Sequence, residues 1–170
     1  MRIVELTAPR DAGRYRAFFG QGLRDHTASF RISPADDAGE GFPTGAADCF
    51  TLAAEDETTG DLLGVASFRR AEANRELLHH RGLLCRMYVA RAAQGRGVGL
   101  RLVQTLIERV RTLGDVRQIN LTVAAHNEPA RRLYQKLGFV SYSLEKNAVR
   151  YGDAFLDEES MALQLFNAPG

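Results

Sequence analysis

The stretch Gln94-Gly95-Arg96-Gly97-Val98-Gly99 lies between an apolar run, Leu83 to Val89, and an apolar-periodic segment that begins at about Val98. This order predicts a strand, a glycine-rich turn and the first turn of a helix. Glycine lets the backbone turn sharply and approach a ligand closely, and the unpaired N–H groups at a helix N-terminus attract negative charge. The sequence therefore predicts a phosphate-binding site at residues 94–99.

Two common nucleotide-binding loops do not fit this stretch. A P-loop continues with Lys and then Ser or Thr after its second glycine, whereas Gly99 is followed by Leu100 and Arg101. The dinucleotide fingerprint needs a glycine at the position of Leu100. The pattern that remains, Q-x-x-G-x-G, resembles the acyl-CoA pyrophosphate loop of the GCN5-related N-acetyltransferase (GNAT) superfamily. From the residues alone, an ordinary strand-to-helix turn stays open as the alternative.

A second segment, Asn127 to Phe139, is similar to the same superfamily at nearly every point. It reads N-E-P-A-R-R-L-Y-Q-K-L-G-F and follows an alternating apolar run at 118–123. Asn127 is a favourable N-cap, Pro129 suits a first helical turn, and Gly138 suits a left-handed C-cap. We therefore expect a short helix over 128–137.

The remaining hydrophobic patterns predict an α/β domain. The order β-α-α-β-β-β-α-β-α-β-β is that of the superfamily, so the resemblance implies a single-domain GNAT fold over residues 1–170. Such a fold has a mixed, mostly antiparallel central sheet flanked by helices. The expected elements are strands at 2–6, 49–56, 62–70, 83–89, 118–123, 139–146 and 159–166, helices at 98–113 and 128–137, helical or irregular structure over 9–34, and a loop rich in glycine, proline and aspartate over 33–48.

Composition narrows the class of protein further. A chain of 170 residues that is 45% hydrophobic can bury one sizeable core. A formal net charge of +1 argues against general nucleic-acid binding. The N-terminus lacks a continuous apolar signal region and no stretch is long enough for a membrane span, so we expect a cytoplasmic protein without membrane association.

Metal binding is not expected. Cys49 and Cys85 are too few and too isolated for a disulfide framework or a thiolate site. His79 and His80 are adjacent, so in a strand they would point to opposite faces, and no third ligand is evident.

The resemblance implies transfer of an acetyl group from acetyl-CoA, the acyl-donor substrate, to a primary amine by direct attack. It assigns the general acid to Tyr134, since a phenol with a reference pKa of about 10 can donate to a thiolate whose conjugate acid has a pKa of about 8.5. From spacing alone, Tyr134 also fits a core aromatic. The implied cofactor-binding residues are Met87, Tyr88, Val89, Gln94, Gly95, Arg96, Gly97, Val98, Gly99, Asn127 and Ala130.

The acceptor side carries weaker signals. Segment 18–48 mixes aromatic and charged residues around glycines, which is typical of a binding loop on a rigid scaffold. A poorly ordered surface insertion stays open as the alternative, and the acceptor site would then be expected in the connection between the last two strands, Asn147 to Glu158. The expected substrate-binding residues are Arg24, Asp25, His26, Phe30 and Arg31.

The general base is left open by the sequence. Many relatives place a Glu early in the strand before the loop, but Leu83 to Val89 contains no carboxylate. The candidates are Asp25, His26, Glu76, His79 and His80.

Two further function classes stay open beside the enzyme. One is an acyl-CoA-binding or sensing domain with little catalysis, and the other is a structural or interaction module. Tyr134 together with the loop favours the enzyme over the sensor. The expected partners are acetyl-CoA and an amine acceptor, either a small molecule or a protein amine, and a homodimer is compatible with the sequence.

Overall fold

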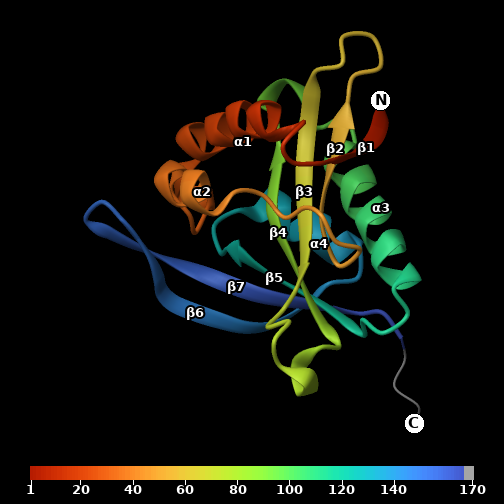
Figure 1. Cartoon of the computed structure of the whole chain (residues 1–170). Helices are drawn as coiled ribbons and strands as arrows, with labels where there is room; N and C mark the ends of the chain where they lie inside the picture. The colour runs from red at the N-terminus through yellow and green to blue at the C-terminus, as the bar shows by residue number, and fades with distance from the viewer. Residues whose placement is uncertain (167–170) are drawn as a thin grey trace.

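A twisted seven-stranded sheet in the order β1-β2-β3-β4-β5-β7-β6 organises residues 1–166, the part of the chain that this computed structural model describes (Figure 1). Neighbouring strands are antiparallel except β4 and β5, which are parallel. The mixed, mostly antiparallel sheet and the order of elements are as the sequence predicts. The elements are β1 (Arg2–Leu6), α1 (Ala12–Asp25), η1 (Thr27–Ser29), α2 (Pro34–Glu40), β2 (Cys49–Glu55), β3 (Leu62–Arg70), η2 (Glu76–Leu78), β4 (Arg81–Val89), η3 (Arg91–Ala93), α3 (Val98–Thr112), β5 (Gln118–Ala124), α4 (Glu128–Lys136), β6 (Val140–Tyr151) and β7 (Ala154–Gln164).

Two hydrophobic clusters fix helices on both faces of the sheet. On one face, α3 buries a stripe at helical spacing that includes Leu102 and Leu106 against β2 and β3. On the other face, α1 buries Phe19 and Leu23 against side chains of β3 and β4. The sheet is thereby held between helices, and β4 lies at its centre (Figure 1).

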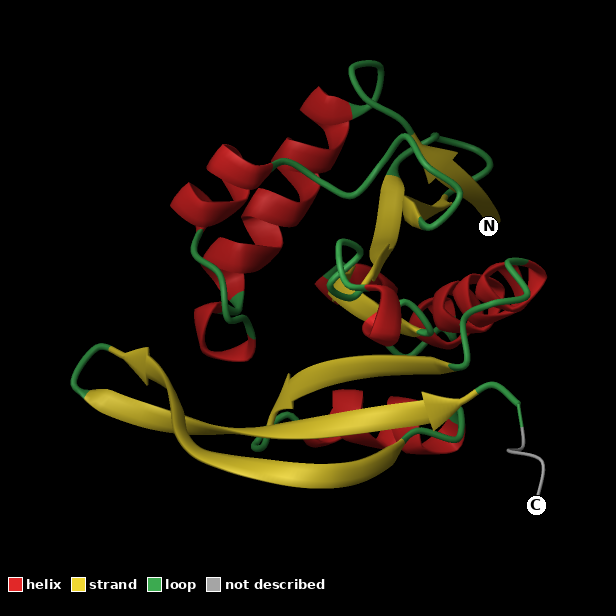
Figure 2. Ribbon diagram, turned by 60° about the horizontal axis from the view of Figure 1, so that its bottom comes forward, coloured by secondary structure: helices red, strands yellow, loops and turns green. Residues whose placement is uncertain are grey.

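The strands β4 and β5 pair over only three positions and then separate. Their register runs from Arg81↔Gln118 to Leu83↔Asn120. Beyond it, β4 carries a register shift against β3 and a left-handed residue, Arg86, with φ of 51°. A bulge of this kind bends its strand and leaves backbone groups without a partner. Figure 2 shows the result, with β5, β6 and β7 forming a layer apart from the outer half of β4.

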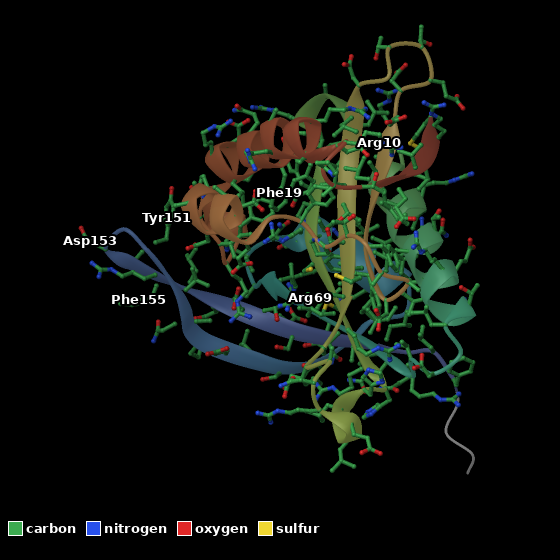
Figure 3. All side chains as sticks on the ribbon, in the orientation of Figure 1. Arg10, Phe19, Arg69, Tyr151, Asp153 and Phe155 are labelled. Carbon is green, nitrogen blue, oxygen red and sulfur yellow. The ribbon has the colours of Figure 1, made fainter. Side chains whose placement is uncertain are left out.

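Two sequence expectations fail in the connecting segments. The expected loop over 33–48 contains helix α2, which begins with a capping box between Ser33 and Asp36 and with Pro34 in its first turn. The last two strands are longer than expected, because the segment 147–158 belongs mostly to β6 and β7 and the hairpin turns at 152–153. This hairpin projects from the body, as the labelled Tyr151 and Phe155 show in Figure 3.

No helix within residues 1–166 is both long and apolar enough to cross a membrane.

Candidate functional site

A cleft of about 770 Å³ opens where β4 and β5 separate. Its walls are the outer half of β4 and residues 121–124 of β5. The glycine-rich loop and the start of α3 lie at one end of it, and residues near η1 lie at the other. The splayed strands therefore join the two segments that the sequence singles out.

The loop presents unpaired N–H groups to this cleft. Gly95 and Gly97 have φ of 74° and 76°, and Gly97 is the N-cap of α3. Within the described residues, no side chain caps this helix, and the first partnered N–H is that of Arg101, which donates to Gly97 O at 3.0 Å. The preceding N–H groups, together with the helix dipole, suit a bound phosphate.

Neighbouring residues hold the loop in place. The Gln94 side chain donates from Nε2 to Val89 O at 3.1 Å and so ties the loop to the end of β4. A Cβ on Gly99 would come within 3.2 Å of Leu133 and Met87, so this glycine lets α3 pack closely on α4 and β4. Arg96 is exposed and is not among the residues that line the cleft.

Helix α4 brings a phenol to the cleft wall. Asn127 caps this helix by accepting a hydrogen bond from Ala130 N at 3.3 Å, and Pro129 occupies the first turn, as the sequence predicts. Tyr134 is 6% exposed, lines the cleft and packs edge-on against Phe139 with ring centres 5.8 Å apart. Among the described residues, no hydrogen bond occupies its hydroxyl group.

Burial controls the protonation of two groups in this wall. Desolvation, with a further contribution from nearby Cys85, raises the pKa of Tyr134, so the phenol stays protonated at neutral pH. Burial also raises the pKa of the Cys85 thiol to about 11, despite the opposing charge of Arg69. Cys85 lines the cleft as a neutral thiol, which is a poor nucleophile.

The β4 wall supplies backbone groups and one aromatic ring. Met87, Tyr88 and Val89 all line the cleft beyond the last β4–β5 pair. Tyr88 is largely buried beneath α1, where its ring contacts Phe18 and His26. The β4–β5 pairing ends at Leu83, so backbone groups of residues 87–89 on that edge have no partner in β5 and can contact a ligand.

Segment 24–31 divides between the cleft and the outer surface. His26, Phe30 and Arg31 line the cleft. Arg24 and Asp25 are instead exposed on α1 and hydrogen-bonded to Gln21. The structure thus brings together three of the five residues expected to bind the acceptor.

Of the candidates for a general base, His26 lies in the cleft. Glu76, His79 and His80 lie on and after η2, next to the beginning of β4, and do not line the cleft. His79 and His80 lie in a turn, between the strands predicted at 62–70 and 83–89. Residues 1–166 contain no group of three or more His, Cys, Asp or Glu side chains placed to hold a metal ion.

Two charged residues of the site are not among the predicted site residues. Arg86, on the β4 bulge, has a side chain that is 8% exposed and forms ion pairs with Asp37 and Glu40 of α2. Glu158, on β7, is 4% exposed and lines the cleft beside Arg31. A charged residue predicted to lie within or beside an apolar strand was the available signal for both, because such a residue needs a buried partner or a functional role.

Comparison with known proteins identifies the family of this chain independently of the cleft. Residues 18–139 match the family described as Acetyltransferase (GNAT) family. The L-methionine sulfoximine/L-methionine sulfone acetyltransferase of Pseudomonas aeruginosa is 28% identical over 155 residues, which cover 88% of this chain and 86% of that protein.

Solved structures share the fold. An acetyltransferase of the GNAT family from Streptococcus pneumoniae has a TM-score of 0.81 at 23% identity, with 96% of this chain and 98% of that one covered. The yncA structure from Salmonella typhimurium, which holds its cofactor acetyl-CoA, has a TM-score of 0.77 at 20% identity, with 100% and 98% covered.

Proposed function

The chain belongs to the acetyltransferase (GNAT) family and is an acyltransferase, and from this premise we propose that it transfers an acetyl group from acetyl-CoA to a primary amine. The amine attacks the thioester directly while both substrates occupy the cleft. The observation that carries the proposal is the continuity of this cleft, which runs from the glycine loop past Tyr134 to His26 and Phe30.

We call the loop 94–99 together with residues 127–134 the donor wall. The N–H groups at the start of α3 would bind the pyrophosphate of acetyl-CoA, and the splayed part of β4 would hold its pantetheine arm and thioester carbonyl. Backbone N–H groups directed at a carbonyl oxygen stabilise the negative charge that develops on it during attack.

Tyr134 would act on the leaving group. Its raised pKa keeps the proton in place at neutral pH, so the hydroxyl can donate a hydrogen bond to the departing thiolate. The neutral Cys85 thiol nearby argues against a covalent acetyl-enzyme, because such a route needs a thiolate.

We call His26, Phe30, Arg31 and Glu158 the acceptor wall. These side chains come from η1 and its flanks and from β7 and combine an aromatic face with charges of both signs. The acceptors named for the Pseudomonas aeruginosa relative are amino-acid derivatives, so L-methionine sulfone belongs in the first acceptor panel.

The experiment is to incubate the protein with acetyl-CoA and a panel of alkylamines, polyamines and amino acids. Release of free thiol is followed, and the products are weighed by mass spectrometry. We expect thiol release that depends on the amine and equals the N-acetylated product formed. Stabilisation by acetyl-CoA without turnover of any amine would instead indicate a sensing domain. The absence of both stabilisation and turnover would indicate a structural module.

A further inference from the structure

Glu158 is a buried carboxylate without a hydrogen bond on one oxygen. The residue is 4% exposed, and its Oε2 atom receives no hydrogen bond from any group in residues 1–166. The nearest cation, Arg31 Nε, lies 3.0 Å from Oε2 but does not direct its N–H at that atom. A buried carboxylate oxygen left in this state is costly, so its retention beside a cleft points to a ligand.

The adjacent residue, Glu159, shows that the missing hydrogen bond is confined to one face of β7. Successive side chains of a strand point to opposite faces. Glu159, 6% exposed, points toward α4, where Arg131 donates a hydrogen bond to it. Glu158 points to the opposite face, toward Arg31 and the η1 segment. The fold thus gives Glu159 a hydrogen bond from Arg131, whereas Glu158 has the ion pair with Arg31 but no hydrogen bond on Oε2.

The position of Glu158 suits contact with an acceptor. In the sheet it lies beside Ala124, the last residue of β5, at the end where β5 has separated from β4. Tyr134 reaches the same cleft from the other face of the sheet. An acid for the leaving thiolate and a carboxylate for the incoming amine would therefore lie on opposite sides of the reacting carbonyl.

We propose that Glu158 holds the ammonium group of the acceptor and takes its proton before attack. This inference rests on the proposed acetyl transfer. The carboxylate removes one proton from R–NH₃⁺, and the nitrogen lone pair forms a bond to the acetyl carbon. The C–S bond then breaks, its electron pair leaves with sulfur, and the thiolate is protonated, while the second nitrogen proton passes to solvent. The products are the N-acetyl amine and CoA thiol.

The charges around Glu158 adjust it for this task. Burial raises the pKa of Glu158, the Arg31 guanidinium opposes the rise, and Glu145, directly across on β6, adds to it. The neighbouring position on β5 is Ala124, which carries no charge. A base works best when its pKa approaches the working pH, and a raised carboxylate pKa moves in that direction.

The test compares Glu158→Gln with the matched control Glu159→Gln. Acceptors are offered as pairs, an alkylamine that is a cation at neutral pH and the corresponding alkoxyamine that is already neutral. Because the second kind needs no base, we expect Glu158→Gln to lower kcat/KM for alkylamines by about 10²–10³-fold and for alkoxyamines by less than tenfold. Glu159→Gln should lose less than threefold with either. The affinity for acetyl-CoA, measured by thermal shift, should stay within about threefold of the wild-type value in both variants.

Arg31→Gln adds a second readout. Removing the guanidinium should raise the pKa of Glu158, so the acid limb of the kcat/KM profile for alkylamines should move to higher pH. A purely structural ion pair would leave that limb in place.

Several results would overturn the assignment. Glu158 would not be the base if Glu158→Gln lost equal activity with alkylamines and alkoxyamines or kept nearly full activity. The same conclusion would follow if Arg31→Gln left the acid limb of the pH profile unchanged. In each case, acetyl transfer by the wild type would still uphold the proposed function. A wild-type protein that acetylates no amine would overturn the proposed function and this assignment together.

Discussion

The two walls of the cleft are built from different kinds of groups. The donor wall, residues 94–99 and 127–134, consists largely of glycines, unpaired backbone N–H groups and a capped helix start, and local rules set its geometry. The acceptor wall consists of side chains from segments far apart in the chain, such as Arg31 and Glu158. A donor wall of this kind can serve any acyl-CoA enzyme, whereas the acceptor wall can change residue by residue.

The sharpest way to break this comparison is to block the backbone of the donor wall. Gly97→Val places a branched side chain at the N-terminus of α3 in a backbone with φ of 76°. The matched control is Gly114→Val, at φ of 77° beyond the other end of α3 and with equally open surroundings. In both variants, strain from the left-handed backbone should lower the free energy of unfolding by about 1–2 kcal/mol.

The two glycine variants should differ in binding. Acetyl-CoA at about a hundred times its dissociation constant should stabilise the wild type and Gly114→Val by about 2.7 kcal/mol. Gly97→Val should show no upward thermal shift. A shift retained in Gly97→Val would place the pyrophosphate elsewhere.

Removing one hydroxyl from the donor wall should affect chemistry without affecting binding. Tyr134→Phe keeps the ring that packs on Phe139 and should lower kcat by about 10²–10⁴-fold with acetyl-CoA affinity unchanged. Tyr142→Phe, on the exposed face of β6, is the control and should match the wild type. Full activity of Tyr134→Phe would make Tyr134 a packing residue only.

The pH profile provides a second check on Tyr134. Burial raises the pKa of this phenol, so its proton is held more firmly than in a free tyrosine. Wild-type kcat should therefore show no alkaline decline from Tyr134 below a pH of about 10. A decline near neutral pH that disappears in Tyr134→Phe would contradict the raised pKa.

Changes in the acceptor wall should be smaller and confined to the amine. His26→Ala and Phe30→Ala should each raise the KM for the amine by about tenfold, equivalent to about 1.4 kcal/mol, with acetyl-CoA affinity within about threefold. Arg24→Ala, on the outer surface of α1, is the control and should leave both constants unchanged. Similar effects of all three variants would show that His26 and Phe30 are not specific contacts of the amine.

The smallest kinetic effect is expected from an ion pair outside both walls. Glu55, at the end of β2, is buried and bonded to Arg14 at 2.8 Å and Arg2 at 3.0 Å. Burial alone would raise the pKa of Glu55, but these hydrogen bonds outweigh it and hold the pKa below the ordinary value of 4.5. A lowered pKa adds stability above that value, and the added stability is lost as the pH falls through the lowered pKa.

Glu55→Gln should therefore lower the free energy of unfolding by about 1–2 kcal/mol at neutral pH, and urea titrations should show the difference shrinking in acid. The kinetic constants should not change. A kinetic effect of this variant would couple the first strands to the cleft.

Sequence reasoning succeeded where a local backbone rule decides the structure. Gly138 adopts the positive φ expected just after a helix, and Asn127 caps α4. The α3 stripe, which includes Leu102 and Leu106, is buried as its spacing predicts. Each of these follows from interactions within a few residues.

Two failures came from local signals that support more than one structure. Ser33-Pro34 begins helix α2 through a capping box, although the surrounding glycines and aspartates suggested a loop. Asn147 has φ of 55° within a register shift of β6, where the sequence suggested the end of a strand. Asparagine tolerates left-handed backbone in bulges as well as in turns, so composition alone did not decide.

His26, Phe30 and Arg31 were predicted from segment 18–48, but Glu158 was not, because it meets Arg31 only through the tertiary fold. Arg31 and Glu158 approach one another because η1 packs near the β6–β7 hairpin, where Thr27 and Tyr151 hydroxyls lie 3.1 Å apart. Nothing near position 158 in the sequence specifies which face of β7 it occupies. The register of β5 with β7, a long-range pairing, sets that face.

The most direct test of direct transfer within one cleft is a bisubstrate kinetic analysis of amine-dependent thiol release. Acetyl-CoA is varied at several fixed amine concentrations, and the protein is weighed after exposure to acetyl-CoA alone. We predict double-reciprocal lines that intersect, together with an unmodified protein mass, because both substrates must occupy the cleft before the C–N bond forms. Parallel lines together with an acetylated protein, for example at Cys85, would contradict the account.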